Sequence, residues 1–336
     1  MSESLCYFSF MSLSVATSLL KPLETSSSLG LFARDTGGCL ISRLSLSRSN
    51  NERKEVSMSE ISESLIFYFS APLLAKLTGK LFNNLTNDKN LAKTGQILST
   101  FSVILPLVYA IAPFRNLMTL SKTGQDEFVS VVGLKKEDNK KDKKEQAKEK
   151  GLDLLKKISL VSLSSLAMTG ALFGACKNDK IHKSLEPVLK KFAKTFEFSD
   201  KNDLKLMHYA ALIYPASILG YFKASRDKYE VMENVRRFCV TVPLLFLGDK
   251  VIEKPIHKFF DKCFNTNVLE GNEIKSYKDI LKLPQNQQKE FLKTKNWAFA
   301  LTFLISTMFV AGGVALLNRI QTKKNYEKDN ELKNKN

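Results

Sequence analysis

Long runs of uncharged residues alternate with lysine-rich segments along this chain. The three longest runs, residues 94–114, 158–176 and 297–317, each hold nineteen to twenty-one residues without a charged side chain. An α-helix rises about 1.5 Å per residue, so each run spans roughly 30 Å, the thickness of the hydrocarbon core of a bilayer. The last run begins at Trp297 and is closed by Arg319, which is typical of interfacial anchoring. We therefore predict three membrane-spanning helices at these positions.

Three further apolar stretches are shorter or interrupted. Lys76 and Lys80 interrupt the stretch near 61–82, and both side chains could snorkel to the water boundary. The stretches near 206–222 and 237–252 are seventeen uncharged residues and an eleven-residue uncharged core, respectively. Each could span a membrane, and half-inserted, re-entrant or surface helices are the alternatives. The predicted fold class is therefore all-α, a polytopic membrane protein of about four to six transmembrane helices.

Two segments between these runs have the pattern of basic amphipathic helices. Their apolar residues fall on one helical face, and lysines fall on the other, which favours a position in the headgroup plane. The candidate membrane-surface residues are Lys190, Lys191, Lys194, Lys254, Lys258 and Lys262. For the first segment, a soluble helical hairpin that covers other loops is the alternative. A third charged stretch, residues 121–157, is expected to be a solvated helix or a disordered loop on the polar side of the membrane.

Small residues gather on one face of the 158–176 run. Gly170 and Gly174 form a G-x-x-x-G pattern, and Ala167 and Ala171 lie on an adjacent stripe. Small residues allow close approach of helix backbones in lipid, where no hydrophobic drive brings helices together. We expect these four residues to pack against another membrane helix, through self-association or within the chain.

The two ends of the chain differ in composition from the middle. Residues 1–57 hold fourteen serines and four arginines against two lysines, whereas residues 58–336 hold five arginines against forty lysines. This shift predicts a separate N-terminal extension, either disordered or a targeting segment, before a helical membrane domain over 58–320. The polar tail, residues 321–336, is expected to be disordered.

The strong positive charge points to anionic lipids more than to nucleic acid. The formal net charge is +17, but 51 basic residues are interleaved with 34 acidic ones and form no compact basic motif. Charges that flank apolar runs match the anionic headgroups of a bilayer. We therefore expect no nucleic-acid partner and a location in the cell membrane, or in an organellar membrane if residues 1–57 are a transit segment.

The sequence offers little catalytic chemistry. The three histidines are far apart, the five cysteines form no C-x-x-C pair, and nucleotide-binding and hydrolase motifs are missing. We expect no catalytic, cofactor or metal site; Asp249 and His208 are the weak candidates for a polar site. The predicted role is non-catalytic, namely structural, scaffold or lipid-interacting. A small-molecule or ion transporter is the main alternative, and a membrane-embedded enzyme or a soluble all-helical protein are further ones.

Overall fold

The computed structural model describes residues 13–135, 141–199, 204–307 and 312–335, and within them the fold is all-α. Helices account for 85% of the structure, which confirms the all-α part of the predicted fold class. One two-stranded hairpin is the exception: β1 (Leu269–Glu270) pairs antiparallel with β2 (Glu273–Ile274).

The helices follow one another along the chain with short connections. The N-terminal part holds α1 (Leu13–Thr25), α2 (Ser27–Arg34), η2 (Asp35–Leu40) and α3 (Ile41–Ser45). The middle holds α4 (Asn50–Ser64), η3 (Leu65–Ser70), α5 (Ala71–Leu85), α6 (Lys89–Thr123), α7 (Phe128–Val131), α8 (Lys141–Ala175) and α9 (Asp179–Phe196). The C-terminal part holds α10 (Leu206–His208), η4 (Tyr209–Ile213), α11 (Tyr214–Ala224), α12 (Lys228–Phe264), α13 (Tyr277–Ile280), α14 (Gln285–Thr307) and α15 (Val314–Lys335).

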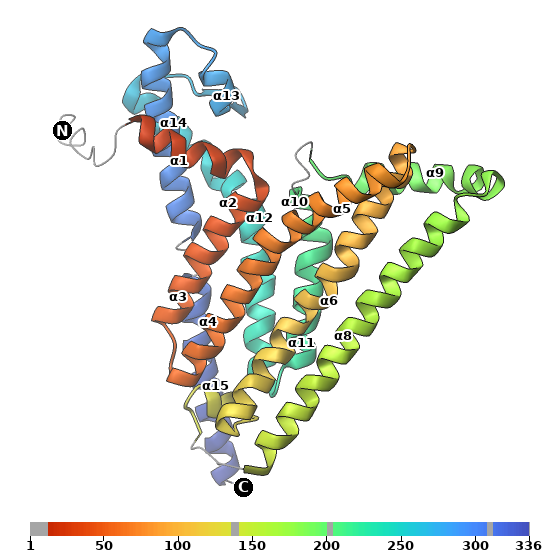
Figure 1. Ribbon diagram of the computed structural model, residues 1–336. Helices are drawn as coiled ribbons and strands as arrows, with labels where there is room; N and C mark the ends of the chain where they lie inside the picture. Colours follow the sequence, from red (N-terminus) through yellow and green to blue (C-terminus); the bar gives the residue numbers. More distant parts are fainter. Residues whose placement is uncertain (1–12, 136–140, 200–203, 308–311, 336) are drawn as a thin grey trace.

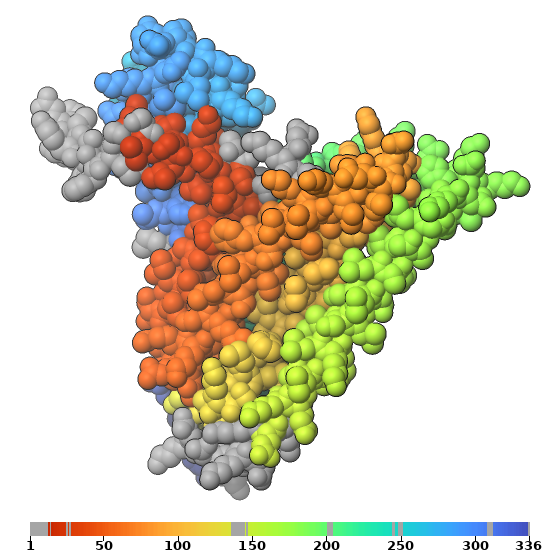
Figure 2. Space-filling view, in the orientation of Figure 1, coloured from red at the N-terminus to blue at the C-terminus, as the bar shows by residue number. Residues whose placement is uncertain are grey.

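The long elements run lengthwise between two ends of the molecule (Figure 1). We call the end that carries the α5–α6 turn, α9 and the hairpin with α13 the upper end. The opposite end, with α7, the α11–α12 turn and the last residues of α15, is the lower end. The chain descends through α2 and α3, rises through α4 and α5, and descends again through α6 (Figure 1). Helix α8 runs along the outer edge of the molecule between these two ends (Figure 2). Residues at the two ends of one helix therefore face opposite sides of the molecule.

Helix α6 is the centre of the bundle and packs against α4, α5, α8, α9 and α11. It begins where the Asp88 side chain accepts hydrogen bonds from two backbone N–H groups, and it ends at Gly124, which adopts the left-handed conformation at φ 76°. Its contact with α11 needs a glycine, because a Cβ on Gly220 would lie 2.3 Å from the carbonyl oxygen of Tyr109. This close approach fixes the spacing of the two helices.

Three helical stretches are long and apolar enough to cross a membrane: Asn50–Leu85, Lys89–Thr123 and Ala147–Ala175. They contain the predicted runs 61–82, 94–114 and 158–176. The predicted runs 206–222 and 237–252 lie in α10–α11 and α12. The run 297–317 is divided between α14 and α15, and residues 308–311 lie outside the described part of the chain.

Large apolar side chains cover the outside of several helices. Those at least 40% exposed include Leu73, Leu77 and Leu81 on α5, Leu160, Leu163 and Met168 on α8, Val240, Leu247 and Val251 on α12, and Leu316, Leu317 and Ile320 on α15. Apolar patches of this extent are rare on monomeric soluble proteins and are typical of surfaces that meet lipid or a partner.

The structure differs from the expected disorder at both ends of the chain. Residues 13–57 are helical, and the Leu31 side chain is buried in the main core beside Tyr68. The tail continues α15 as far as Lys335, and Asp329 accepts a hydrogen bond from the Tyr229 hydroxyl at 2.6 Å. Side-chain contacts to distant elements account for this order, and the local composition does not predict such contacts. The charged stretch 121–157 includes α7 and the first turns of α8, which agrees with the helical alternative expected for it, and residues 136–140 lie outside the described residues.

Candidate functional site

A network of buried arginine–glutamate pairs connects α3, α4, α6 and α12 in the lower half of the bundle. We call this set the arginine network: Arg43, Arg48, Arg115, Arg226, Arg237, Glu52, Glu55, Glu60, Glu63, Glu230 and Glu233. Every one of these side chains is less than a quarter exposed.

Arg226 is the best-paired member of the arginine network. Its two terminal nitrogens donate to Glu55 Oε1 and Oε2 at 2.8 and 2.9 Å, and its Nε donates to Glu230 Oε2 at 3.0 Å. Arg115 donates to the other oxygen of Glu230 at 2.6 Å. Planar guanidinium groups suit such two-point contacts with carboxylates. Phe128 of α7 lies against Arg226, and the distance from the guanidinium carbon to the centre of the Phe128 ring is 5.7 Å.

A second part of the arginine network lies higher along α4. Glu60 accepts hydrogen bonds from Arg43 and, at 3.0 Å, from Arg237. Arg237 is also 3.5 Å from Glu63, and its guanidinium carbon lies 4.9 Å from the ring centre of Tyr221. The charged groups of this part therefore lie beside an aromatic ring and have little contact with water.

The sequence explains how these acids meet the arginines. On α4, Glu52, Glu55, Glu60 and Glu63 recur at spacings of three, five and three residues, which places them on one broad face of a helix. Sequence reasoning missed the network because it treated residues 1–57 as separate. The available signal was arginine itself: the chain has nine arginines against forty-two lysines, and five of the nine belong to the network.

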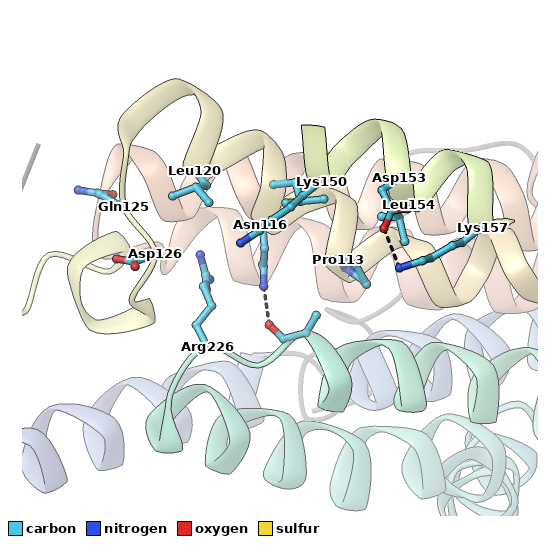
Figure 3. Close-up of a pocket in the computed structure, with 12 residues that line it drawn as sticks. Pro113, Asn116, Leu120, Gln125, Asp126, Lys150, Asp153, Leu154, Lys157 and Arg226 are labelled. Atoms are coloured by element: carbon cyan, nitrogen blue, oxygen red, sulfur yellow. Dashed lines mark hydrogen bonds and ion pairs between the residues drawn. The ribbon is translucent and has the colours of Figure 1, made fainter. Parts of the chain in front are cut away.

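A pocket of about 350 Å³ adjoins the arginine network between α6, α8 and the α11–α12 turn (Figure 3). We call it the α6–α8 pocket. It is lined by Pro113, Asn116, Leu117, Leu120, Gln125, Asp126, Lys150, Asp153, Leu154, Lys157, Ala224 and Arg226.

Asn116 ties the floor of the α6–α8 pocket to the arginine network. Its side-chain oxygen accepts from Arg115 at 2.7 and 2.9 Å, and its amide nitrogen donates to the Ala224 carbonyl at 2.5 Å. Lys157 is paired with Asp153 one turn away at 2.6 Å. The Lys150 side chain extends along the pocket toward Asn116 (Figure 3). The pocket thus combines apolar walls with an ammonium group at its rim, which suits an amphiphilic anion.

The structure places the predicted packing residues on the outside of the chain. Gly170, Gly174, Ala167 and Ala171 all lie on the exposed face of α8, and a Cβ added to either glycine would meet no atom within 4 Å. They therefore make no close helix contact within the described residues. Packing against a second chain stays a prediction.

The predicted surface lysines are exposed, but α9 uses its apolar face differently from our expectation. Lys190, Lys191, Lys194, Lys254, Lys258 and Lys262 are all exposed. On α9, Leu189 and Ala193 are buried, and Leu189 packs with Leu91 and Cys176. Much of the apolar stripe of α9 therefore meets protein, where the sequence predicts lipid.

Of the two weak polar-site candidates, the structure describes the side chain of His208 alone. His208 is 1% exposed; its Nδ1 accepts from the Lys205 backbone N–H at 2.8 Å, and its Nε2 lies 2.7 Å from the Phe196 carbonyl oxygen. These bonds make His208 a structural residue that joins α10 to the end of α9. Helix α12 passes through Asp249, but the side chain of Asp249 lies outside the described residues.

At the upper end, His182 and Asp88 connect α9 to the start of α6. His182 Nε2 lies 2.6 Å from Asp88 Oδ2. Partial burial opposes ionisation of Asp88, but the backbone N–H groups of Leu91 and Asn90, together with His182, hold the pKa of this carboxyl below its usual value.

The described residues contain no group of three or more histidine, cysteine or acidic side chains arranged to hold a metal ion. Comparison of the chain with protein-family models, with curated proteins and with solved structures gave no match. The arginine network and the α6–α8 pocket are therefore interpreted from their own geometry.

Proposed function

We propose that this chain is an integral membrane protein with a non-catalytic, lipid-interacting role, and that its α6–α8 pocket binds the headgroup of an anionic phospholipid. The observation that carries the proposal is how little of the apolar part of α8 is buried inside the protein. Its stretch Ala147–Ala175 is apolar enough to cross a membrane, yet only 6% of its apolar window is buried inside the protein. An apolar helix with so little protein around it needs another apolar environment.

The position of the α6–α8 pocket supports a headgroup as its ligand. On α8, charged residues end at Lys157 and an uncharged run begins at Ile158. On α6, the uncharged run ends at Phe114, and Arg115 and Asn116 follow. Both helices therefore change from apolar to polar beside the pocket, as expected at the headgroup level of a bilayer.

The charges that line the α6–α8 pocket favour an anionic ligand. Lysine and arginine contribute three cations, and Asp126 and Asp153 contribute two anions. Arg226 is committed to Glu55 and Glu230, and Lys157 is committed to Asp153. We assign the phosphate contact to Lys150, with the acyl chains lying along the exposed leucines of α8. Lysine stems can lie against apolar surface while the ammonium reaches the phosphate.

Membrane insertion is tested by alkaline carbonate extraction, in which we expect the protein to stay in the pellet. Single cysteines at Lys89 and Asn272, near the upper end, should react with an impermeant reagent from one side of sealed vesicles. Cysteines at Lys122 and Lys333, near the lower end, should react from the other. Release into the supernatant would favour the soluble all-helical alternative and end the membrane proposal.

Headgroup binding is tested on delipidated protein in detergent by native mass spectrometry with phosphatidylglycerol and phosphatidylcholine. We expect retention of phosphatidylglycerol to fall several-fold in Lys150→Gln, since an exposed charge contact contributes about 1 kcal/mol. The matched control is Lys156→Gln, which removes an exposed lysine of α8 that does not line the pocket. Equal loss in both variants, or no preference for the anionic lipid, would refute a specific pocket.

A further inference from the structure

A second cavity, of about 310 Å³, lies nearer the upper end of the molecule, between the N-terminal helices, α12, α14 and the hairpin. We call it the upper cavity. It is lined by Glu24, Arg34, Glu253, Ile274, Lys295, Phe299, Thr302 and Phe303. Its volume is at the lower end of the range for small-molecule sites. No residue of this cavity belongs to the α6–α8 pocket, so its interpretation is independent of the lipid proposal.

Lys295 and Glu24 form a fixed wall of the upper cavity. Lys295 is 1% exposed, and its Nζ lies 2.6 Å from Glu24 Oε1. The other oxygen of Glu24 accepts a hydrogen bond from the Tyr277 backbone N–H at 3.2 Å. Because a buried ammonium is stable only when it is paired, this wall holds α1 against α14.

Thr302 carries an unused hydrogen-bonding group on the wall of the upper cavity. Its side chain is 4% exposed, and its hydroxyl makes no hydrogen bond within the described part of the chain. Buried polar groups without a partner are uncommon and costly. A hydroxyl in this setting can donate to a ligand carboxylate without breaking any bond in the protein.

The charged side chains of the upper cavity balance one another. Glu24 and Glu253 contribute two negative charges, and Arg34 and Lys295 contribute two positive ones. A ligand with a net charge would upset this balance in a confined site, whereas a ligand with one positive and one negative group would preserve it. Phe299 and Phe303 add apolar surface for an aliphatic part of the same ligand.

We propose that the upper cavity binds a small zwitterionic solute of the amino-acid type. Its carboxylate would lie between the Arg34 guanidinium and the Thr302 hydroxyl, and its ammonium group would lie toward Glu253. The aliphatic side chain would contact Phe299 and Phe303. Such binding goes beyond the proposed lipid-interacting role and would give the protein a solute-recognition function.

The test uses the full chain in detergent and isothermal titration calorimetry with L-leucine as the probe. Isocaproate, which is leucine without its ammonium group, and isoamylamine, which is leucine without its carboxylate, are the matched single-charge probes. We expect saturable binding of leucine at one site per chain and at least about tenfold weaker binding of either single-charge probe.

Two isosteric variants locate the binding. Thr302→Val removes the hydroxyl that lines the upper cavity and should weaken leucine binding about tenfold. Thr307→Val is the control, because its hydroxyl on the same helix also lacks a partner but does not line the cavity. Absence of leucine binding, equal affinity for a single-charge probe, or equal effects of the two variants would each overturn the proposal.

Discussion

The arginine network and the upper cavity are two polar regions inside the same bundle, and they differ in how fully their groups are paired. In the arginine network, each glutamate has a guanidinium nitrogen within 4 Å. Glu63 Oε1 and Arg237 Nη1 make no hydrogen bond among the described residues, but both groups are paired through their other atoms. Around the upper cavity, the Thr302 hydroxyl and both ring nitrogens of His257 have no hydrogen-bond partner among the residues that the structure describes. A paired network holds helices together, whereas unused hydrogen-bonding groups beside a cavity can serve a ligand.

The cations also differ between the two regions. The arginine network uses guanidinium groups, which bind a carboxylate at two points and lose little hydration when they are buried. The upper cavity is lined by one guanidinium group, that of Arg34, and by one ammonium group, that of Lys295, which makes one close contact to Glu24 at 2.6 Å. We therefore expect substitutions in the lower region to have the larger effect on folding.

The largest effect is expected for Arg226→Met. This change leaves Glu55 and Glu230 buried with only Arg115 nearby, and breaking a buried pair costs about 3–5 kcal/mol. The melting temperature of the detergent-solubilised protein, followed by intrinsic fluorescence, should fall strongly. Lys228→Met is the control, because Lys228 is 66% exposed and pairs only with Asp329 among the described residues.

Arg226→Lys sharpens the same experiment. It keeps the positive charge but cannot contact both oxygens of Glu55 and also reach Glu230. We expect a melting temperature between those of the wild type and Arg226→Met. If Arg226→Lys or Arg226→Met melts like the wild type, two-point pairing is not what holds α4 to α12.

Gly220→Val should have the next largest effect, because it tests packing beside the arginine network. The added side chain would collide with the Tyr109 carbonyl and force α6 and α11 apart, at a cost of about 1–3 kcal/mol. Gly170→Val is the matched control on α8, where a Cβ meets open space. We expect it to leave the melting temperature of the monomer nearly unchanged. A loss of oligomer in Gly170→Val, detected by crosslinking in membranes, would instead identify the small-residue face as a self-association surface.

The sequence predicts much of the helical framework and little of the polar interior. Apolar runs near 94–114 and 158–176 identify helices because burial in protein and burial in lipid both select uncharged side chains. The arginine network joins residues as distant as Arg48 and Glu233, and no local pattern pairs them. The compositional shift at residue 57 pointed to a separate segment, whereas the structure shows arginines that meet glutamates from elsewhere in the fold.

The pockets were beyond sequence reasoning for a similar reason. The α6–α8 pocket combines three segments, and the upper cavity combines the N-terminal helices with α12, α14 and the hairpin. Lys295 stands in the sequence as a flanking charge before an apolar run. Only the packing of α1 on α14 turns it into a buried partner of Glu24.

A smaller effect is expected from His257, which lies beside the upper cavity and beyond the apolar part of α12. Burial and the nearby Lys295 lower the pKa of His257 to about 4, against the weaker opposing effect of Asp261. Glu253 Oε1 is 3.9 Å from its Nε2. Because the unfolded chain binds the proton more readily, the contribution of neutral His257 is complete above about pH 6.5 and declines as the pH falls toward 4.

The measurement is the difference in melting temperature between pH 7 and pH 5 for the wild type and His257→Gln. We expect the free energy of unfolding of the variant to fall by about 2 kcal/mol less than that of the wild type over this interval. Carboxylates elsewhere titrate in both proteins, so their contribution cancels in the comparison. An identical pH dependence in the two proteins would show that His257 is not buried in its neutral form.

The smallest effect on stability is expected for Thr302→Val. This variant tests directly whether the upper cavity holds an unpaired hydroxyl. Valine has nearly the shape of threonine, and the lost hydroxyl has no partner to leave behind, so the free energy of unfolding should change by less than about 0.5 kcal/mol or rise slightly. Thr100→Val is the comparison, since the Thr100 hydroxyl donates to the Gln96 carbonyl at 2.7 Å and lies 2.8 Å from the Thr78 hydroxyl. The free energy of unfolding of that variant should fall by about 1 kcal/mol or more, because the Thr78 hydroxyl loses its hydrogen bond with Thr100. If Thr302→Val is as destabilising as Thr100→Val in the ligand-free protein, the Thr302 hydroxyl already has a partner, and the upper cavity has no unused hydroxyl to offer a ligand.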